Sequence, residues 1–500
     1  MTDKVTAHTS PRSGPYGIRL AQTGPQPDVT GEPASTALPE LVTRLARAAD
    51  RHDSRRARKR SAVGGQVVDA GPVAAAWATA KLAVTAAGSP IVSAVMGALA
   101  ASNTAAAKRL TLDYPAQVDG VLRGEPPPIP AGRVGRFDAG SRWFISSDLH
   151  RAPRGSADWP LAQNTKGLYE VALGHYGAEG WGLIENGDVE DFWLVGGSTY
   201  GVVYDAVRTF ASALPRSARH QLRVHLYGEH LQRVVANNRE IYDLIDELFH
   251  GRGRYVRLAG NHDDCYLDDS VVEHLRGVHD GIEMYDFVVL DGQSGPKAVV
   301  THGHHTDSWN APGRSGLGRW MTWLASAVVD APLLSSNPGT PSPSETYALL
   351  GGTHPDRLTV VNPAFGFNRG LYTVDEVLLF EAFDRHFGDT GPKVLLGHTH
   401  LPVVNPSEPK PGTGSWKQYL NSGSGVHWEL VTGIEWDGAA DAAGDTGSGD
   451  PRARLVGWHF ATDDTPREAI VAEHQGRPVA RRWFEPAADG ATLDVFPASR

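Results

Sequence analysis

The feature of the sequence that most constrains its fold is a series of polar clusters rich in Asp, His and Asn. In chain order they are Asp148-Leu149-His150, Gly187-Asp188-Val189-Glu190-Asp191, Gly260-Asn261-His262-Asp263, His302-Gly303-His304 and Gly397-His398-Thr399-His400. A short apolar run precedes each cluster, and the Val, Ile and Leu in these runs predict buried strands. The predicted strands are Arg142–Ser147, Trp181–Asn186, Tyr255–Ala259, Lys297–Thr301 and Lys393–Leu396. Because open α/β sheets place their sites just past the carboxyl ends of strands, we expect the clusters to form one site.

The residue types in the clusters indicate metal chemistry. Carboxylate oxygen, amide oxygen and imidazole nitrogen suit divalent cations, and the clusters contain no thiolate. We therefore expect two divalent metal ions, manganese, iron or zinc rather than magnesium, in a hydrolytic site.

The order and wording of the clusters resemble the calcineurin-like metallophosphoesterases, whose motifs read D-x-H, G-D-x-x-D, G-N-H-D, H and G-H-x-H. One such motif alone is weak evidence, but all of them in order are specific. The resemblance covers residues 134–486. It implies an α/β fold, a four-layer αββα sandwich of two mixed β-sheets flanked by helices, with a helical cap insertion.

The resemblance also implies the ligands of two metal ions. One ion is expected on Asp148, His150, Asp188 and His400, and the other on Asp188, Asn261, His302 and His398. Asp188 would bridge the two ions and bring them to about 3.5 to 4 Å, close enough to share an activated hydroxide. The implied reaction is hydrolysis of a phosphomonoester or phosphodiester by direct attack of that metal-bridging hydroxide.

Catalytic roles are implied for His262 and Asp263. His262 would stabilise the phosphoryl oxygen or protonate the leaving alkoxide, and Asp263 would hold its imidazole in the useful tautomer. Asp191 is expected to accept hydrogen bonds rather than to bind metal. His304 and His305 extend the fourth cluster, and contact with metal, with substrate or only with backbone is left open for both. His302 is the expected ligand of this cluster, and His304 is expected at most to support the ligands.

The substrate stays open. The segment from Gly187 to Trp193 is similar to one in UDP-diacylglucosamine pyrophosphatases, but those enzymes commonly carry Arg where this chain has His262. A phosphorylated small molecule or a nucleotide is expected, and a cyclic-nucleotide phosphodiesterase, phosphomonoesterase, nucleotide pyrophosphatase and protein phosphatase all fit. The alternatives are a metal-dependent nuclease and a non-catalytic scaffold. A formal charge of −10 gives no strong nucleic-acid signal.

Cysteine usage and the start of the chain bear on location. Cys265 is the one cysteine, so no intramolecular disulfide can form and a reducing compartment is expected. A buried filler is the favoured interpretation of Cys265 over a catalytic thiol. No apolar h-region follows Met1, so we expect a cytoplasmic protein.

The chain before about Arg133 is expected to lie outside the catalytic domain and to be dispensable for hydrolysis. Residues 1–62 read as a disordered basic tail with a short helix through Leu38–Ala49. Residues 63–133 read as an Ala-rich helical segment and a Pro-rich linker. The uncharged stretch Leu82–Ala107 is long enough to span a bilayer, but Pro90 and the absence of Trp and Tyr favour small-residue helices. Weak membrane-surface or partner contact through 51–109 is left open, with possible peripheral membrane association.

The rest of the domain contains two insertions, at about 192–230 and 305–372. Leu231–Phe249 has the spacing of one amphipathic helix, and Leu455–Phe460 and Val479–Phe484 read as strands of a second sheet. The second insertion is interpreted either as a cap over the substrate or as an accessory core. Residues 487–500 are expected to be a C-terminal tail, and the oligomeric state is unknown.

Overall fold

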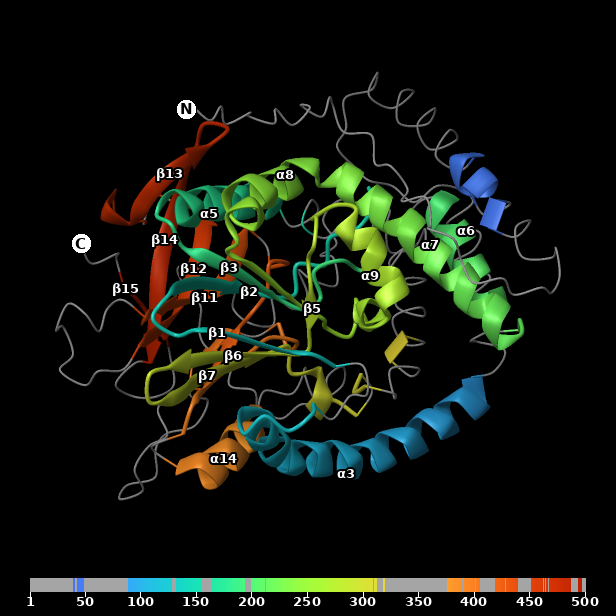
Figure 1. Cartoon of the computed structure of the whole chain (residues 1–500), viewed down its shortest axis with the longest axis horizontal. Helices are drawn as coiled ribbons and strands as arrows, with labels where there is room; N and C mark the ends of the chain where they lie inside the picture. Colours follow the sequence, from blue (N-terminus) through green and yellow to red (C-terminus); the bar gives the residue numbers. More distant parts are fainter. Residues whose placement is uncertain are drawn as a thin grey trace, which may run out of the picture.

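Two β-sheets packed face to face form the centre of the protein in the computed structural model (Figure 1). The structure describes residues 39–40, 43–48, 89–127, 132–154, 158, 160, 164–193, 199–211, 213–308, 310–312, 318–319, 376–388, 391–400, 402–404, 419–427, 429–438, 451–461, 463, 465, 467–486 and 493–496.

The first sheet has six strands and is mixed. Their order is β1 (Val134–Asp138), β6 (Phe287–Gly292), β7 (Gly295–Thr301), β8 (Lys393–Leu396), β10 (Tyr419–Ser422) and β9 (Pro402–Val404). β7, β8 and β10 run parallel, whereas the β6–β7 pair is an antiparallel hairpin. The parallel β7–β8 pair places the ends of both strands at one edge of the sheet.

The second sheet has nine strands. Their order is β13 (Ile470–His474), β14 (Arg477–Pro486), β12 (Arg452–Phe460), β11 (Leu430–Asp437), β2 (Arg142–Ser146), β3 (Gly182–Asn186), β4 (Tyr255–Leu258) and β5 (Met284–Tyr285), with β15 (Leu493–Phe496) paired to β14. β2 to β5 run parallel, and β11 to β15 are antiparallel. The strands predicted at 455–460 and 479–484 are therefore confirmed as part of a second sheet.

Helices cover the outer face of each sheet. Apolar side chains such as Ile184, Leu258, Val300 and Leu395 fill the space between the sheets. Helices α5 (Lys166–Ala178) and α8 (Arg239–Leu248) pack on the nine-stranded sheet, and α3 (Ser89–Leu122) and α14 (Glu376–Phe387) pack on the six-stranded sheet. The expected mixed α/β architecture of two sheets between helices is thus confirmed (Figure 1).

The predicted domain boundary at residue 134 does not coincide with the edge of the packed core. The C-terminal part of α3 contributes Tyr114, Val118 and Val121, all at most 1% exposed, to the core beneath the six-stranded sheet. The Tyr114 hydroxyl also contacts Thr301 Oγ1 at 3.1 Å, one residue before His302. Helix α3 therefore belongs to the domain that carries the site.

The helix predicted over Leu231–Phe249 is two helices. α7 (Arg216–Asn237) is followed by Asn238, whose side chain donates to Val234 O, and α8 begins at Arg239. An asparagine that bonds back to its own helix favours a break in the helix at this point. The first insertion is accordingly α6 (Thr199–Ala211) and most of α7, followed later by α9 (Asp269–Arg276).

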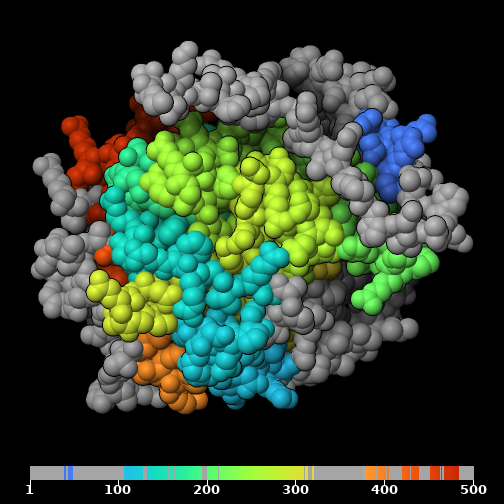
Figure 2. All heavy atoms as spheres, in the orientation of Figure 1, coloured from blue at the N-terminus to red at the C-terminus, as the bar shows by residue number. Residues whose placement is uncertain are grey.

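The short helix expected near residues 38–49 is present over 43–48 and packs on the first insertion. Ala46 is fully buried in a cluster with Tyr200, Tyr204 and Leu222, and Thr43 Oγ1 lies 2.9 Å from His225 Nε2. In Figure 2 the blue atoms of this helix lie at the same end of the molecule as the green atoms of the insertion. The rest of the expected N-terminal tail and most of 305–372 lie outside the described residues. Of the expected C-terminal tail, Leu493–Phe496 is instead strand β15 of the second sheet, and 487–492 and 497–500 lie outside the described residues.

None of the helices in the described part of the chain combines the length and the apolar character needed to cross a bilayer.

Candidate metal centre

The seven expected ligands meet at one edge shared by the two sheets. Asp148 and His150 follow β2, Asp188 follows β3 and Asn261 follows β4, while His302 follows β7 and His398 and His400 follow β8. Each of the seven is at most 5% exposed. Both sheets therefore contribute to a single buried site.

The backbone is strained at most of these positions. Asp148, His150, Asp188, His398 and His400 have positive φ angles between 44° and 74°, and only three other non-glycine residues of the described chain share this property. The left-handed conformation costs a non-glycine residue roughly 1 to 3 kcal/mol and is retained mainly where function requires it. Five such residues in one cluster mark this edge as a functional site.

Glycines give the clusters the room they need. A Cβ atom at Gly260 would collide with Asp188 Oδ1, and one at Gly187 would lie 2.6 Å from His302 Nδ1. The Gly that precedes Asn261 and the Gly that precedes Asp188 therefore allow two loops to approach each other closely.

Six of the ligands form two groups whose ligand atoms converge. The first group is Asp148, His150 and His400, and the second is Asp188, His302 and His398; within each group the atoms lie within 4.8 Å of one another. In the first, His150 Nε2 lies 3.1 Å from His400 Nε2, and His400 Nε2 lies 3.3 Å from Asp148 Oδ1. Each group contains three of the four ligands expected for one ion, without Asp188 in the first and without Asn261 in the second. A third group, His150, Asp191 and His262, converges in the same way at the solvent side.

Asp188 stands between the two groups. Its Oδ2 atom lies 3.3 Å from His302 Nε2 and 3.9 Å from His150 Nε2. Its other oxygen, Oδ1, accepts a 2.7 Å hydrogen bond from the backbone of His262. A carboxylate in this place is able to bridge two cations.

Three of the candidate ligand histidines have their outer ring nitrogen held by an oxygen. His150 Nδ1 lies 3.1 Å from Asp191 Oδ2, His302 Nδ1 lies 2.8 Å from Asn186 O, and His398 Nε2 lies 3.1 Å from Asp307 Oδ2. The other nitrogen of each ring then points toward the groups. Metal-binding histidines almost always show this arrangement, because the outer bond fixes the tautomer and the ring orientation.

The arrangement of the atoms that face the centre suits coordination of a cation better than hydrogen bonding between these atoms. Among the described residues, Asp148 Oδ1, Asn261 Oδ1 and His302 Nε2 are buried without a hydrogen bond of normal geometry, although nitrogen and oxygen approach to 3.3 Å. Ligands about 2.0 to 2.2 Å from one metal ion lie at such separations from each other. The residues present therefore fit divalent metal ions.

Asp191, rather than Asp263, holds the imidazole of His262. His262 Nδ1 lies 2.9 Å from Asp191 Oδ1, whereas Asp263 accepts hydrogen bonds from the backbone amides of Gly260 and Val189 at 2.6 and 3.0 Å. The expected role of Asp263 is corrected accordingly, because its carboxylate is turned toward the two ligand loops. Asp263 fastens those loops to each other.

His262 lies at the solvent side of the site. Its side chain is 15% exposed, and its ring stacks on Trp193 with centroids 4.5 Å apart. All seven candidate ligands are more deeply buried. A substrate that reaches the metal groups by this route would meet His262.

The site is strongly charged without metal. Burial raises the pKa of Asp188, but the positive charges of His302 and His262 outweigh it and hold that pKa well below its ordinary value. Burial lowers the pKa of His262, but Asp191 and Asp188 raise it to about 9. The neighbouring charges therefore favour the ionised, cation-binding form of Asp188 and the protonated form of the His262 ring.

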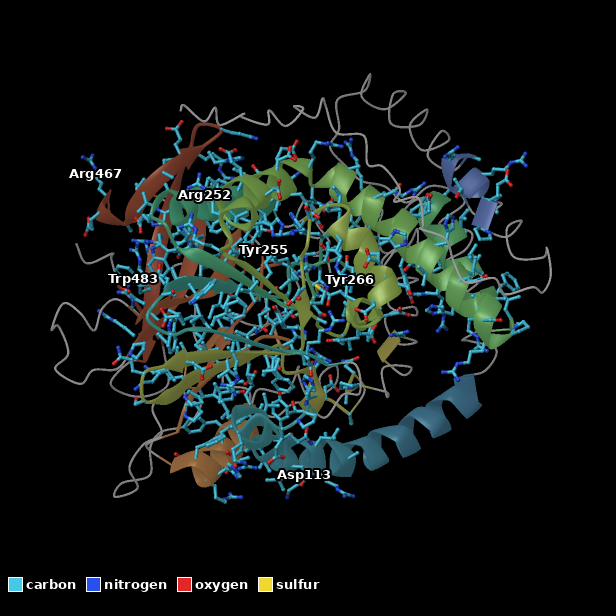
Figure 3. All side chains as sticks on the ribbon, viewed as in Figure 1. Asp113, Arg252, Tyr255, Tyr266, Arg467 and Trp483 are labelled. Atoms are coloured by element: carbon cyan, nitrogen blue, oxygen red, sulfur yellow. The ribbon has the colours of Figure 1, made fainter. Side chains whose placement is uncertain are left out.

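A network of buried charges supports the ligand loops from below. Arg257 binds Glu190 and lies 3.4 Å from Asp263 Oδ2, and Arg151 binds Glu185. The partly buried Tyr255 donates to Glu185, and the Tyr266 ring lies 5.7 Å from the Arg257 guanidinium; both tyrosines are labelled in Figure 3. Glu190 is thus a partner of arginine and not a metal ligand. Neither arginine was expected from the sequence.

Glu376 at the start of α14 holds the last cluster. It accepts hydrogen bonds from Thr399 Oγ1 at 2.6 Å and from Asn421 Nδ2 at 3.0 Å, and Asn421 also donates to Gly397 O. Glu376 is 1% exposed. Like Asp307, it carries no sequence signal, because it is remote along the chain from the motif that it supports.

His304 and Cys265 are not assigned a catalytic or metal-binding role. His304 is buried but belongs to none of the metal-binding groups found among the described residues. Burial raises the pKa of the Cys265 thiol well above its ordinary value, as expected for a filler rather than a nucleophile.

Comparisons with protein-family models, with curated proteins and with solved structures found no match to this chain.

Proposed function

We propose that this protein is a dinuclear metal-dependent phosphoesterase of the calcineurin-like type, which hydrolyses a phosphomonoester or a phosphodiester. The observation that carries the proposal is the pair of buried His and Asp groups, Asp148-His150-His400 and Asp188-His302-His398, in which the outer nitrogens of His150, His302 and His398 each lie against an oxygen. The Asp188 carboxylate also approaches His150 of the first group to 3.9 Å. Such second contacts favour a metal centre over a buried polar network.

The expected ligands would hold two metal ions. Asp148, His150 and His400 would hold one ion, and Asn261, His302 and His398 the other, with Asp188 common to both. When bound, two divalent cations neutralise the oxygens of a phosphate and activate water for attack on phosphorus. Manganese, iron or zinc is the expected metal, since nitrogen and oxygen ligands are mixed.

His262 would act on the leaving group. Its Nδ1 is tied to Asp191, so Nε2 carries the proton that can be delivered outward. The ring is partly exposed, and Trp193 packs on its face and keeps it at the edge of the site. Proton delivery to a departing alkoxide is the role that this geometry supports.

The proposal is tested with a substrate panel. Full-length protein with added Mn²⁺ is assayed on aryl phosphomonoesters, aryl phosphodiesters, cyclic nucleotides and nucleotide sugars, with a chelator-treated sample alongside. Hydrolysis of at least one class, lost on chelation and restored by Mn²⁺, is expected. Asp188→Asn should lower turnover by several orders of magnitude, because it removes the bridge between the two ions. A panel without any metal-dependent hydrolysis would overturn the proposal.

A further inference from the structure

The first insertion holds the backbone of the loop that follows the second cluster. Three consecutive carbonyl groups, of Asp191, Phe192 and Trp193, accept hydrogen bonds from side chains of α6 and α7. His230 Nε2 lies 2.9 Å from Asp191 O, and Tyr204 Oη lies 3.0 Å from Phe192 O. Arg208 Nη1 donates to Phe192 O at 3.0 Å and to Trp193 O at 3.3 Å.

These three side chains are themselves fixed. Arg208 donates to Asp205 Oδ1 at 3.0 Å and lies over the Tyr204 ring at 5.6 Å. Burial lowers the pKa of His230 to about 3, so its ring is neutral and carries one proton. A carbonyl can only accept, so the proton is on Nε2, and Nδ1 is left to accept from Tyr200 Oη at 3.3 Å.

The other side of the same loop sets the surroundings of His262. The Asp191 carboxylate binds Nδ1 of His262, the Trp193 ring stacks on its face, and the Phe192 amide donates to His262 O at 3.3 Å. Every contact between residues 191–193 and His262 therefore depends on how the loop is turned. The amides of Asp191 and Trp193 hold the loop from the side of the site, on Arg151 O and Asp191 Oδ1. The side chains of the insertion hold its three carbonyls, and a loop that loses such contacts becomes more mobile.

We propose that Tyr204, Arg208 and His230 are positioning residues for His262, acting through the backbone of residues 191–193. The first insertion is then part of the catalytic apparatus rather than a surface addition. This inference rests on the proposed role of His262, and the experiment below separates the two.

The test is a double-mutant cycle on metal-loaded, full-length protein, with the aryl phosphate that the panel identifies as substrate. Tyr204→Phe removes one hydroxyl from the loop and should lower kcat about three- to tenfold, the worth of one buried hydrogen bond, with KM and metal content unchanged. Arg208→Ala should lower kcat at least as much, and Arg208→Lys should restore part of it. In the His262→Ala background Tyr204→Phe should have no further effect, because the group that it positions is gone.

The matched control is Tyr227→Phe. The Tyr227 ring packs on Phe192 at 5.4 Å, but no hydrogen bond joins its hydroxyl to residues 191–193 in the described structure. Its kcat should match that of the unchanged protein. Equal losses of kcat from Tyr204→Phe in the presence and absence of His262 would overturn the inference while leaving the proposed function intact.

A second measurement needs no substrate. Hydrogen–deuterium exchange should be faster at the amides of residues 191–193 in Tyr204→Phe and Arg208→Lys than in Tyr227→Phe, because the loop opens more easily. Exchange that is the same in all three variants would also overturn the inference. Failure of the proposed function would appear differently, as a substrate panel without metal-dependent hydrolysis, whereas the exchange rates of the variants would still differ. A His262→Ala variant as active as the unchanged protein would overturn the role of His262 and this inference with it.

Discussion

Asp307 offers the sharpest test of the metal centre. Its side chain is fully buried, and its Oδ2 lies 3.1 Å from His398 Nε2, the nitrogen that faces away from the ligand group. Asp307→Asn keeps an oxygen acceptor but loses the negative charge, whereas Asp307→Ala loses both. Removal of such a contact costs about 10- to 100-fold in metal affinity. We expect about tenfold for Asn and about a hundredfold for Ala, or about 1.4 and 2.7 kcal/mol.

Competition between the protein and a fluorescent chelator for Mn²⁺ measures this effect. Because His398 belongs to one ligand group only, one of two binding steps should weaken and the other should not. Asn310→Ala is the control. Asn310 Nδ2 donates to the same Asp307 oxygen at 2.7 Å, so this variant removes a neighbouring hydrogen bond of Asp307 but keeps the carboxylate that lies against His398. If Asp307→Ala folds and binds two ions with unchanged affinity, His398 is not a ligand that Asp307 orients.

Three other expectations follow from the geometry. His262→Ala should keep both metal ions by elemental analysis yet lose about 10²- to 10⁴-fold in turnover, and an emptied site would make His262 a ligand instead. Arg257→Met leaves Glu190 and Asp263 buried without their cation, so chemical denaturation should show a loss of about 3 to 5 kcal/mol, and a stable variant would contradict the supporting network. A protein that begins at Gly132 lacks α3 and with it about 5 to 9 kcal/mol of stabilisation from apolar burial, which is comparable to the whole stability of a domain. This truncated protein should therefore be insoluble in a sedimentation assay or unfolded by circular dichroism.

The strands and the ligand loops could be predicted because their signals are local. A short run rich in Val, Ile and Leu that ends in Asp, Asn or His is visible within ten residues, and the parallel order of β2, β3 and β4 brings such ends together. The role of Asp191 beside His262 was less visible, since Asp263 is the nearer carboxylate along the chain. Only the turn of the backbone at Gly260 shows that Asp263 faces the amides.

The packing of α3 on the sheet has a signal in the sequence, but the Ala-rich composition of the preceding residues obscures it. Tyr114, Val118 and Val121 recur at helical spacing and form an apolar stripe, but the Ala-rich stretch before them suggests a separate segment. Asp307 and Glu376 had no such signal, because a buried acceptor of a histidine or threonine is defined by its distance in space. Tertiary contacts of this kind are specified by the fold and not by a motif.

The contact between α3 and the end of β7 has a consequence for how the chain is made. Tyr114 and Thr301 are 187 residues apart. A ribosome that adds about 5 to 20 residues per second therefore synthesises Thr301 about 10 to 40 s after Tyr114. During that interval the apolar stripe of α3 has no sheet to cover it. The nascent chain is therefore expected to depend on a chaperone, or on transient burial of this helix against its own earlier segments, until the hairpin of β6 and β7 has emerged.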